Sequence, residues 1–384
     1  MLYIVVVTVL AVFGGLVYYV GLRGWQWLSA FFPYGQLRPV YWSIHWLLAL
    51  AFPLTRFSPA RLPIWLWEML GRAGAFWMGL FAFSLVLVAL MDLVRLISRW
   101  LHLIPAGPLP VEAIKLLGSV VFLAAMGLSL YGTWRARTPV VTEYAFSIPK
   151  AAGARKDLHV VLVSDTHFGS VLGTGRARRL VDLVNSLEPD IILMAGDIVD
   201  DDFRAFVQRD MASELRRLNA PLGVYGVLGN HDPYPEDPAA FRAQMERAGI
   251  RLLVDEWVLV DNSFYVVGRS DSSLARYTGA PAVPLHEVLA GVDRSLPVLV
   301  MDHRPDRLDE AQAEGIDLQV SGHTHKGQIF PGSLITNRVY EVDWGYLKKG
   351  SSYFVVSLGY GTWGPPIRIG NAPEVVSIHL TFGQ

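Results

Sequence analysis

Long apolar stretches occupy the first third of the chain. Four of them contain no Asp, Glu, Lys or Arg: Leu2–Leu22, Val40–Thr55, Ala73–Met91 and Leu116–Trp134. A helix needs about 20 apolar residues to cross the bilayer core, so this pattern predicts an all-α transmembrane bundle of about four helices. The second stretch is the shortest and contains Pro53, and a buried helix of a soluble domain is the alternative interpretation for it.

A cleaved signal peptide is the competing interpretation of Leu2–Leu22. Signal peptides have a basic segment before the apolar core and a small-residue cleavage site after it. Neither feature is found here, so a spanning helix is favoured.

The segments between the apolar stretches are rich in tryptophan. Arg23–Trp27 and Ile64–Trp67 have the composition of side chains at lipid headgroups, although packing between helices explains these tryptophans equally well. Leu62–Leu70 is predicted to be a short interfacial helix. Four spans would place both termini on one side of the membrane. Basic residues are balanced between the two sets of loops, so the side that holds the C-terminal half stays open.

Three ionisable residues, His45, Asp92 and Glu112, lie in or near the apolar stretches. Ionisable groups inside a membrane are functional candidates. We favour an ordinary interfacial position at a helix end for all three.

The overall composition agrees with membrane burial. Of 384 residues, 52% are hydrophobic and 17% are charged, against about 25% charged in soluble domains. The formal net charge of −1 provides no basic surface, so nucleic acid is not expected as a partner. The absence of cysteine excludes disulfides, thiolate metal sites and cysteine nucleophiles.

From Leu158 onward, short apolar runs alternate with helical segments. Helices are predicted at Thr174–Leu187, Phe203–Leu218, Ala239–Ala248 and Arg307–Glu314. Closely linked strands are predicted at Val258–Val260, Phe264–Gly268, Tyr353–Leu358 and Val375–Leu380. The first pattern is typical of βαβ units and the second adds antiparallel pairing. Together they predict an α/β domain whose two mixed sheets form a β sandwich flanked by helices.

These patterns divide the chain into three segments. Residues 1–137 are predicted to form the transmembrane domain, and residues 158–384 the α/β domain. Residues 138–157 are predicted to be a linker that includes a first edge strand at Val140–Phe146.

Five apolar runs of the α/β domain end in residues that can bind a metal. The runs are Leu158–Val163, Asp190–Ala195, Leu222–Leu228, Leu296–Met301 and Leu318–Ser321. The polar residues that follow them are Asp165, His167, Asp197, Asn230, His231, His303, His323 and His325. Ligands of open α/β folds collect beyond the carboxyl ends of the strands, so we expect one shared site.

The donors in this set are oxygen and imidazole, without sulfur. They suit Mn²⁺, iron or Zn²⁺ better than Mg²⁺ or Ca²⁺. There are too many donors for a single four-coordinate ion, which indicates two metal ions that could share a bridging carboxylate. Gly196, Gly229 and Gly322 precede the ligands and allow the backbone to turn closely around a metal or a phosphate.

The five blocks DTH (Asp165–His167), GD, GNHD, a lone His and GHTH stand in the order of a known motif set. In this the chain resembles the calcineurin-like metallophosphoesterases from Leu158 to the C-terminus. GHTHKGQIFPG and the late Pro365–Arg368 and Pro373-Glu374 resemble the bacterial membrane-associated YkuE/YaeI branch, whose members often carry N-terminal transmembrane helices. Lys326 departs from the glycine that is common there.

The resemblance implies two divalent metal ions, for which we favour manganese, with iron or zinc as alternatives. It implies that Asp165, His167 and His325 hold the first ion, that Asp197 bridges, and that Asn230, His303 and His323 hold the second. It further implies attack by a metal-bridging hydroxide, with His231 as the general acid and Asp232 orienting its imidazole. A histidine suits proton donation near neutral pH.

These patterns predict a membrane-anchored dinuclear-metal phosphoesterase that hydrolyses a phosphoester or diphosphate. The membrane domain favours an amphiphilic substrate, either a phospholipid or a lipid-linked phosphate, and a location in the bacterial inner membrane. One alternative is a non-catalytic metal-binding scaffold, or a regulatory domain, attached to a functional membrane domain. A transporter regulated by its soluble domain is another, less supported by the few charged residues in the helices.

Two long connections, Ser270–Pro284 and Gly332–Gly350, are predicted binding loops. The predicted substrate contacts are Arg276, Arg304 and Lys326, with Lys348 and Lys349 as further candidates. Solvated surface charge is the alternative for each of them. Asp200, Asp201 and Asp202 are predicted to form a loop and a helix N-cap, not further ligands.

Overall fold

A computed structural model describes residues 2–57, 62–105, 107–200, 203–232, 237–275, 279 and 281–383. The chain divides into two compact units, Met1–Thr133 and Trp134–Gln384. The first unit is helical and the second contains every described strand.

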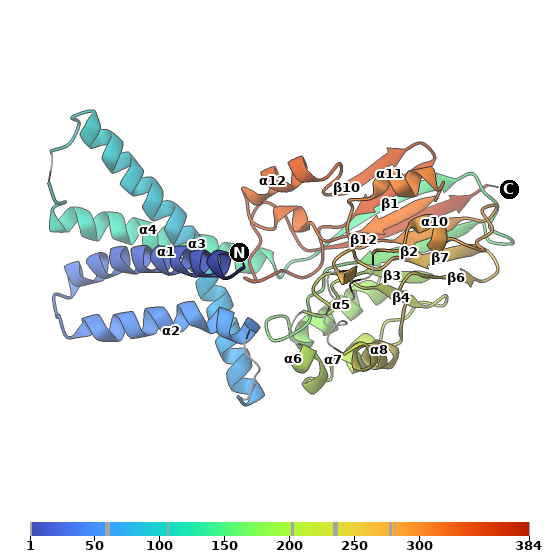
Figure 1. Ribbon diagram of the computed structural model, residues 1–384, viewed down its shortest axis with the longest axis horizontal. Coiled ribbons are helices and arrows are strands. Elements are labelled where there is room, and N and C mark those ends of the chain that lie inside the picture. The colour runs from blue at the N-terminus through green and yellow to red at the C-terminus, as the bar shows by residue number, and fades with distance from the viewer. Residues whose placement is uncertain are drawn as a thin grey trace. The chain divides into compact units, whose positions relative to one another are not determined.

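Four helices form the N-terminal unit: α1 (Leu2–Phe31), α2 (Leu37–Phe57), α3 (Ile64–Trp100) and α4 (Val111–Arg135) (Figure 1). Among the described residues, α1, α3 and α4 are long and apolar enough to cross a membrane. The prediction of about four helices is confirmed, but only three of them are candidate spans. The second is shorter than the others and contains polar residues and Pro53, which lower its hydropathy.

The predicted interfacial helix at Leu62–Leu70 is wrong. Pro63 is the N-cap of α3, and the helix then continues without interruption through its 37 residues. Proline is favoured at a helix start and no proline follows within α3. The tryptophans of this segment therefore belong to the first turns of a long helix.

Polar contacts and close packing connect the helices of this unit. Arg23 of α1 pairs with Asp92 of α3 at 2.7 Å, and His45 Nε2 of α2 lies 3.0 Å from the Val17 carbonyl of α1. A Cβ at Gly74 would lie 2.4 Å from a backbone nitrogen of α2, so α2 and α3 approach closely there. His45 lies in the middle of α2 and Asp92 about two turns before the end of α3, so neither is at a helix end as predicted, whereas Glu112 is in the first turn of α4.

Two six-stranded mixed sheets form the C-terminal unit, as predicted. The first has the order β1 (Val140–Ile148), β12 (Glu374–Phe382), β2 (Asp157–Val163), β3 (Ile191–Ala195), β4 (Val224–Val227), β5 (Ile250–Leu252). The second has the order β10 (Gly345–Lys349), β11 (Ser352–Val356), β9 (Leu318–Ser321), β8 (Val298–Met301), β7 (Phe264–Gly268), β6 (Glu256–Val260). Strands β2 to β5 run parallel, as do β7, β8, β9 and β11.

Helices cover the outer faces of the sheets. Those on the first sheet are α5 (Thr174–Asn185), α6 (Phe203–Gln208), α7 (Met211–Leu215) and α8 (Pro238–Arg247), and those on the second are α10 (Leu285–Val288) and α11 (Leu308–Ala313). The 3₁₀ turn η1 (His325–Gly327) and α12 (Gly332–Val339) follow β9. The single helix predicted at Phe203–Leu218 is two helices, α6 and α7, because Asp210 takes a left-handed conformation with φ 51°. Strands β5 and β10 and helices α10 and α12 were not predicted, since each is short.

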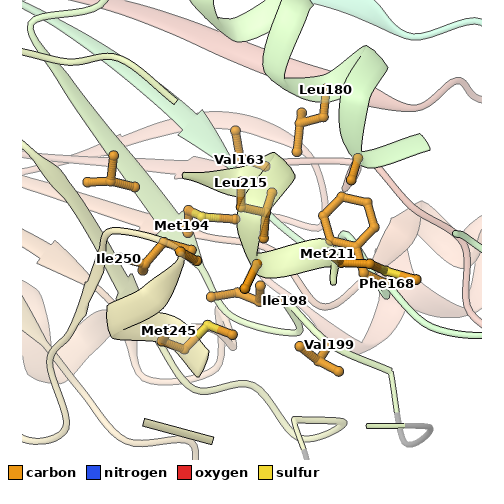
Figure 2. Packing of buried hydrophobic residues seen from close by; sticks show 14 of the residues in the cluster. Val163, Phe168, Leu180, Met194, Ile198, Val199, Met211, Leu215, Met245 and Ile250 are labelled. Atoms are coloured by element: carbon orange, nitrogen blue, oxygen red, sulfur yellow. The ribbon is translucent and has the colours of Figure 1, made fainter. Parts of the chain in front are cut away.

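The apolar run of β2 is continuous because both faces of its sheet are buried. Val160 and Leu162 pack between the two sheets, whereas Val161 and Val163 pack against α5 to α8. Figure 2 shows Val163 in this second cluster, with Leu180 of α5 and Leu215 of α7. Full burial of one such side chain contributes about 1.5–3 kcal/mol. The rigid layers hold the loops that follow the strands.

Candidate metal centre

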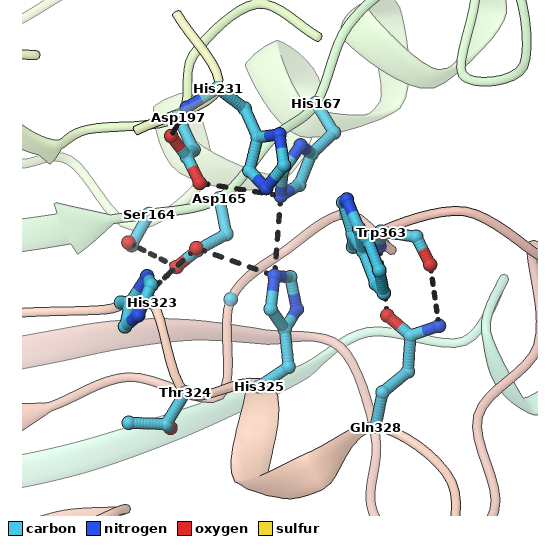
Figure 3. Close-up of polar contacts among 12 residues, drawn as sticks. Ser164, Asp165, His167, Asp197, His231, His323, Thr324, His325, Gln328 and Trp363 are labelled. Carbon is cyan, nitrogen blue, oxygen red and sulfur yellow. Dashed lines mark hydrogen bonds and ion pairs between the residues drawn. The ribbon is translucent and has the colours of Figure 1, made fainter. Parts of the chain in front are cut away.

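The predicted ligands lie in loops that follow five strands of the C-terminal unit. Asp165 and His167 follow β2, Asp197 follows β3, and Asn230 and His231 follow β4; His303 follows β8, and His323 and His325 follow β9. These strands are parallel within each sheet, so their carboxyl ends meet at one edge. Residues far apart in the sequence are therefore brought together (Figure 3).

The first group of ligands is Asp165, His167 and His325, whose donor atoms all lie within 4.8 Å of one another. The Nε2 atoms of the two histidines are 3.2 Å apart. His325 Nε2 is also 3.4 Å from Asp165 Oδ1. All three residues are buried, and the donors converge on a space of the size that one ion needs.

The second group is Asp197, His303 and His323, which meets the same 4.8 Å limit. Asp197 Oδ2 lies 3.2 Å from His303 Nε2 and 3.7 Å from His167 Nε2. One carboxylate oxygen therefore faces a ligand of each group. This is the position that a bridging ligand requires.

Two buried polar atoms point to the same use. Among the described residues, Asn230 Oδ1 has no hydrogen-bond partner, and His303 Nε2 has only its ion pair with Asp197. The opposite nitrogen of His303, Nδ1, donates to the Ala195 carbonyl at 2.8 Å, which leaves Nε2 to face the site. A buried acceptor without a partner costs about 1–3 kcal/mol, and a bound cation would remove this cost. The residues present fit two divalent ions.

The charges of the second group are tightly coupled. Burial alone would lower the pKa of His303, but Asp197 raises that pKa well above its usual value. Burial would likewise raise the pKa of Asp197, yet His303 holds it well below its usual range. A metal at this group would displace a proton from the imidazole, because only the neutral ring binds metal.

Two of the other histidines, His323 and His325, are kept neutral. Burial and the neighbouring His303 lower the pKa of His323 to about 3. Burial and the Arg368 guanidinium hold the pKa of His325 well below its usual value. Both imidazoles are therefore in the form that coordinates metal.

The backbone is strained where the ligands are. Asp165, His167, Asp197, His323 and His325 all have positive φ, between 45° and 70°. Such values are uncommon for residues other than glycine and cluster at functional sites. Room for these turns comes from glycine: a Cβ on Gly322 would lie 2.2 Å from Asp165 Oδ2, and one on Gly229 would lie 2.1 Å from Asp197 Oδ1.

Asp200 is a residue whose role sequence reasoning missed. Its Oδ1 lies 3.5 Å from His167 Nδ1, on the side of the ring opposite the site, and the residue is buried. A carboxylate in this position commonly fixes the orientation of a metal-binding histidine. The sequence feature that could have indicated this role is that Asp200 comes three residues after the ligand Asp197. Asp201 and Asp202 lie outside the described residues.

Asp232 does not have the predicted contact with the His231 imidazole in the described part of the chain. Its two oxygens accept the backbone N–H groups of Val199 at 2.9 Å and of Gly229 at 2.8 Å. Burial and the nearby Asp197 raise the pKa of Asp232 to about 7. Two backbone donors therefore occupy this carboxyl group. It holds the loop that carries Asn230, and it does not orient the His231 imidazole.

His231 stands at the edge of the first group. Its ring centre is 5.3 Å from that of His167, and its backbone N–H donates to Asp197 at 2.8 Å. Trp363, which was not predicted, also lies near this ring, with ring centres 5.9 Å apart. Gln328 holds Trp363 through the backbone N–H and carbonyl of that residue (Figure 3).

Arg368 is fully buried behind His325. Its Nη2 donates to the carbonyls of Leu358, Gly359 and Gly361 at 2.7–3.0 Å and lies 3.2 Å from His325 Nδ1. It joins the loop after β11 to the ligand loop after β9. The sequence predicted no role for Arg368 beyond its place as the last residue of the Pro365–Arg368 motif.

The predicted substrate contacts differ in their surroundings. Arg304 pairs with the buried Asp271 at 2.8 Å, and Lys326 Nζ lies 4.0 Å from the centre of the Trp344 ring. Arg276 lies outside the described residues. On the edge strand β10, Lys348 donates to the Tyr353 hydroxyl at 3.1 Å, and Lys349 pairs with Asp309 and Glu341.

Comparison with known proteins agrees with this geometry. The profile of the calcineurin-like phosphoesterases matches residues 158–327. An uncharacterised metallophosphoesterase of Aquifex aeolicus is 33% identical over 226 residues, which cover 58% of this chain and 85% of that protein. The metallophosphoesterase YkuE of Bacillus subtilis is 27% identical over 232 residues, with coverage of 58% and 78%.

A further relative is a membrane protein by its name and contains the same kind of domain. It is a transmembrane protein with metallophosphoesterase domain of Danio rerio, 28% identical over 269 residues. The alignment covers 66% of this chain and 60% of that protein. A crystal structure of a Thermus thermophilus protein aligns with 14% identity and a TM-score of 0.35, over 53% of this chain and 90% of that one.

The chain belongs to the calcineurin-like metallophosphoesterases. This class combines an α/β domain with Asp and His ligands at the strand ends. In this member, the domain follows three helices that are long and apolar enough to span a membrane.

Proposed function

We propose that this protein is a membrane-anchored phosphoesterase that uses two divalent metal ions, with manganese favoured. The observation that carries this is the pair of three-residue ligand groups, with Asp197 Oδ2 facing a histidine of each. Two ions held at adjacent groups would neutralise the charge of a phosphoryl oxygen and acidify a water molecule.

The protein groups around the ligands determine their geometry. Asp200 and Arg368 fix the first group from behind, and Asp232 fixes the loop after β4. The Asp165 carboxylate accepts the backbone N–H of His323 at 3.0 Å, so the first group also positions a ligand of the second. This preorganisation holds the donors in place before the substrate arrives.

We assign proton donation to the leaving oxygen to His231. It is only partly buried, lies beside His167, and is tied to Asp197 by its backbone. A general acid must be near the site and accessible to the substrate, and imidazole suits donation near neutral pH. Trp363 packs against this ring and would limit its movement.

For the substrate we propose a phosphoester or diphosphate that carries a lipid chain. Five large apolar side chains near the site are each more than half exposed. Phe330, Leu334, Ile335 and Val339 lie on the segment that follows His325, and Trp363 lies beside His231. We call this set the apolar rim. Exposed apolar patches of this kind commonly bind apolar partners, and a lipid chain beside the scissile phosphate would cover it.

For the location we propose the bacterial inner membrane. Support comes from the three candidate spans and from the likeness to YkuE of Bacillus subtilis. A protein anchored there would meet lipid-linked phosphates in the plane of the bilayer.

The test is Mn²⁺-dependent release of product by the full-length protein in detergent. Substrates would be a soluble aryl phosphodiester, a phospholipid and a lipid-linked diphosphate. We expect Asp197→Asn to abolish turnover of all of them, with Asp293→Asn, a carboxylate in an exposed turn, as the matched control. A metal-loaded protein that turns over none of the substrates would contradict the proposal and support a binding scaffold.

A further inference from the structure

A cavity of about 800 Å³ lies among the helices of the N-terminal unit. Its walls come from all four helices and are mainly apolar, with Val88 of α3 and Leu117 and Val121 of α4 among them. Sites for small amphiphilic ligands have volumes of roughly 300–1,000 Å³ and combine apolar walls with a few polar groups. The cavity falls in this range.

Five polar residues also line the cavity: Arg23, Gln26, Asp92, Arg95 and Ser98. Arg23 is hydrogen-bonded to both Gln26 and Asp92, and Arg95 and Ser98 follow Asp92 within two turns of α3. We call this group the polar end of the cavity. Asp92 Oδ2 accepts two hydrogen bonds from Arg23, at 3.0 and 2.7 Å, and one from Tyr19. The negative charge of Asp92 is therefore compensated by Arg23.

Arg95 has no such partner. Its only polar contact among the described residues is one hydrogen bond, 3.0 Å long, from Nη2 to the Gly107 carbonyl, and its buried Nε has no acceptor. Arg99 donates to the same carbonyl, so this oxygen is shared by two cations. The polar end of the cavity has an excess positive charge and an unfilled donor.

An uncompensated cation among membrane helices is costly, and such residues generally face a partner or an aqueous path. The lining of the cavity indicates the chemistry of the partner: an anionic group for Arg95, joined to an apolar chain for the apolar walls from α3 and α4. We propose that the cavity binds one anionic phospholipid, with its phosphate at Arg95 and an acyl chain against Val88 and Val121. This lipid site is separate from the metal centre, and it does not require that the bound lipid be hydrolysed.

The experiment uses native mass spectrometry to measure how delipidated full-length protein binds two lipids with the same acyl chains. These lipids are phosphatidylglycerol and phosphatidylcholine. We expect wild type to prefer phosphatidylglycerol. Arg95→Gln should weaken phosphatidylglycerol binding about fivefold, the effect of one basic residue at a membrane surface, and leave phosphatidylcholine unchanged. Arg38→Gln, an exposed arginine of α2 outside the cavity, is the matched control and should change neither lipid.

A second variant tests the cavity independently of charge. Val88→Trp fills the apolar part and should reduce binding of both lipids, while far-ultraviolet circular dichroism reports whether the helices remain. Equal binding of both lipids by wild type, or unchanged phosphatidylglycerol binding by Arg95→Gln, would overturn the proposal. Metal-dependent turnover of a soluble aryl phosphodiester, measured on the same samples, reports on the proposed function separately, since neither variant touches the metal centre.

Discussion

The Nε2 atoms of His167 and His325 lie 3.2 Å apart, although 158 residues separate the two histidines. Asp165 lies against the same pair. Ring nitrogens this close to each other and to a carboxylate are placed to share one cation, which the imidazoles bind in their neutral form. The folded chain should therefore bind metal that the unfolded chain cannot bind in the same way.

Metal removal should destabilise the C-terminal unit. A ligand that binds only the folded state adds about 2.7 kcal/mol of stability at 100 times its dissociation constant. We expect the thermal unfolding midpoint to rise when Mn²⁺ is added to chelator-treated protein. His325→Ala should reduce this rise, whereas His286→Ala, an exposed histidine of α10, should not. Equal midpoints with chelator and with Mn²⁺ would show that the groups hold no ion.

The Asp200 carboxylate, 3.5 Å from His167 Nδ1, should control metal affinity without being a ligand. Loss of such an outer carboxylate typically lowers metal affinity or activity 10–100-fold. We expect Asp200→Asn to require about that much more Mn²⁺ for half-maximal activity, while its maximal rate with excess metal stays near that of wild type. The measurement is a Mn²⁺ titration of turnover. An unchanged titration curve would assign Asp200 a purely structural role.

Patterns of residues along the chain predicted the two sheets, and they singled out residues that the structure brings together at the strand ends. Each apolar run that ends in Asp, Asn or His is local information, and parallel strands bring their ends together regardless of sequence distance. For this reason β2, β3, β4, β8 and β9 were all anticipated, together with the residues that follow them.

The supporting contacts were not predictable in the same way. Asp232 was predicted to orient an imidazole, but the fold supplies two backbone N–H groups to it instead. Asp200 acts from the far side of His167, and Arg368 reaches His325 across 43 residues of sequence. Such contacts depend on loop conformations with positive φ, which composition does not specify.

Arg368 illustrates how much a buried contact contributes. Its replacement by methionine leaves the carbonyls of Leu358 and Gly361 without their donor, at a cost of about 1–3 kcal/mol for each unsatisfied group, whereas the Gly359 carbonyl keeps the backbone N–H of Glu374. We expect Arg368→Met to lower the free energy of unfolding by about 2 kcal/mol or more and to weaken metal binding at the first group. Denaturant unfolding and metal content are the measurements.

The matched control for Arg368 is Arg294→Met. Arg294 pairs with Glu314 at 3.1 Å, and both side chains are partly exposed. Pairs of this kind contribute about 0–1 kcal/mol. Equal losses of stability for the two variants would mean that the carbonyls behind His325 find other donors.

His231 should affect the leaving group and not the metals. With His231→Gln we expect unchanged metal content and a rate that falls by about 10²–10⁴-fold for alkyl esters, the usual contribution of a general acid. Nitrophenolate leaves without a proton, so the loss should be much smaller for nitrophenyl esters. The measurement is the rate across a series of leaving groups. An equal loss for every ester would assign His231 to binding and not to proton transfer.

The apolar rim should matter for lipid substrates alone. Leu334 and Ile335 of α12 are 60% and 67% exposed, and α12 follows directly after the segment that carries His325. Burial of one such side chain against lipid is worth about 1.5–3 kcal/mol, and 1.4 kcal/mol is a factor of ten. We expect the double variant Leu334→Asp, Ile335→Asp to lower turnover of dilute lipid substrate by roughly tenfold or more. Turnover of a soluble aryl phosphodiester should stay unchanged.

The control for the apolar rim is Val207→Asp, at an exposed apolar residue on α6, which should lower turnover of neither substrate. A uniform loss on both substrates would place the defect in the metal centre, whereas no loss on either would mean that the rim does not touch the substrate.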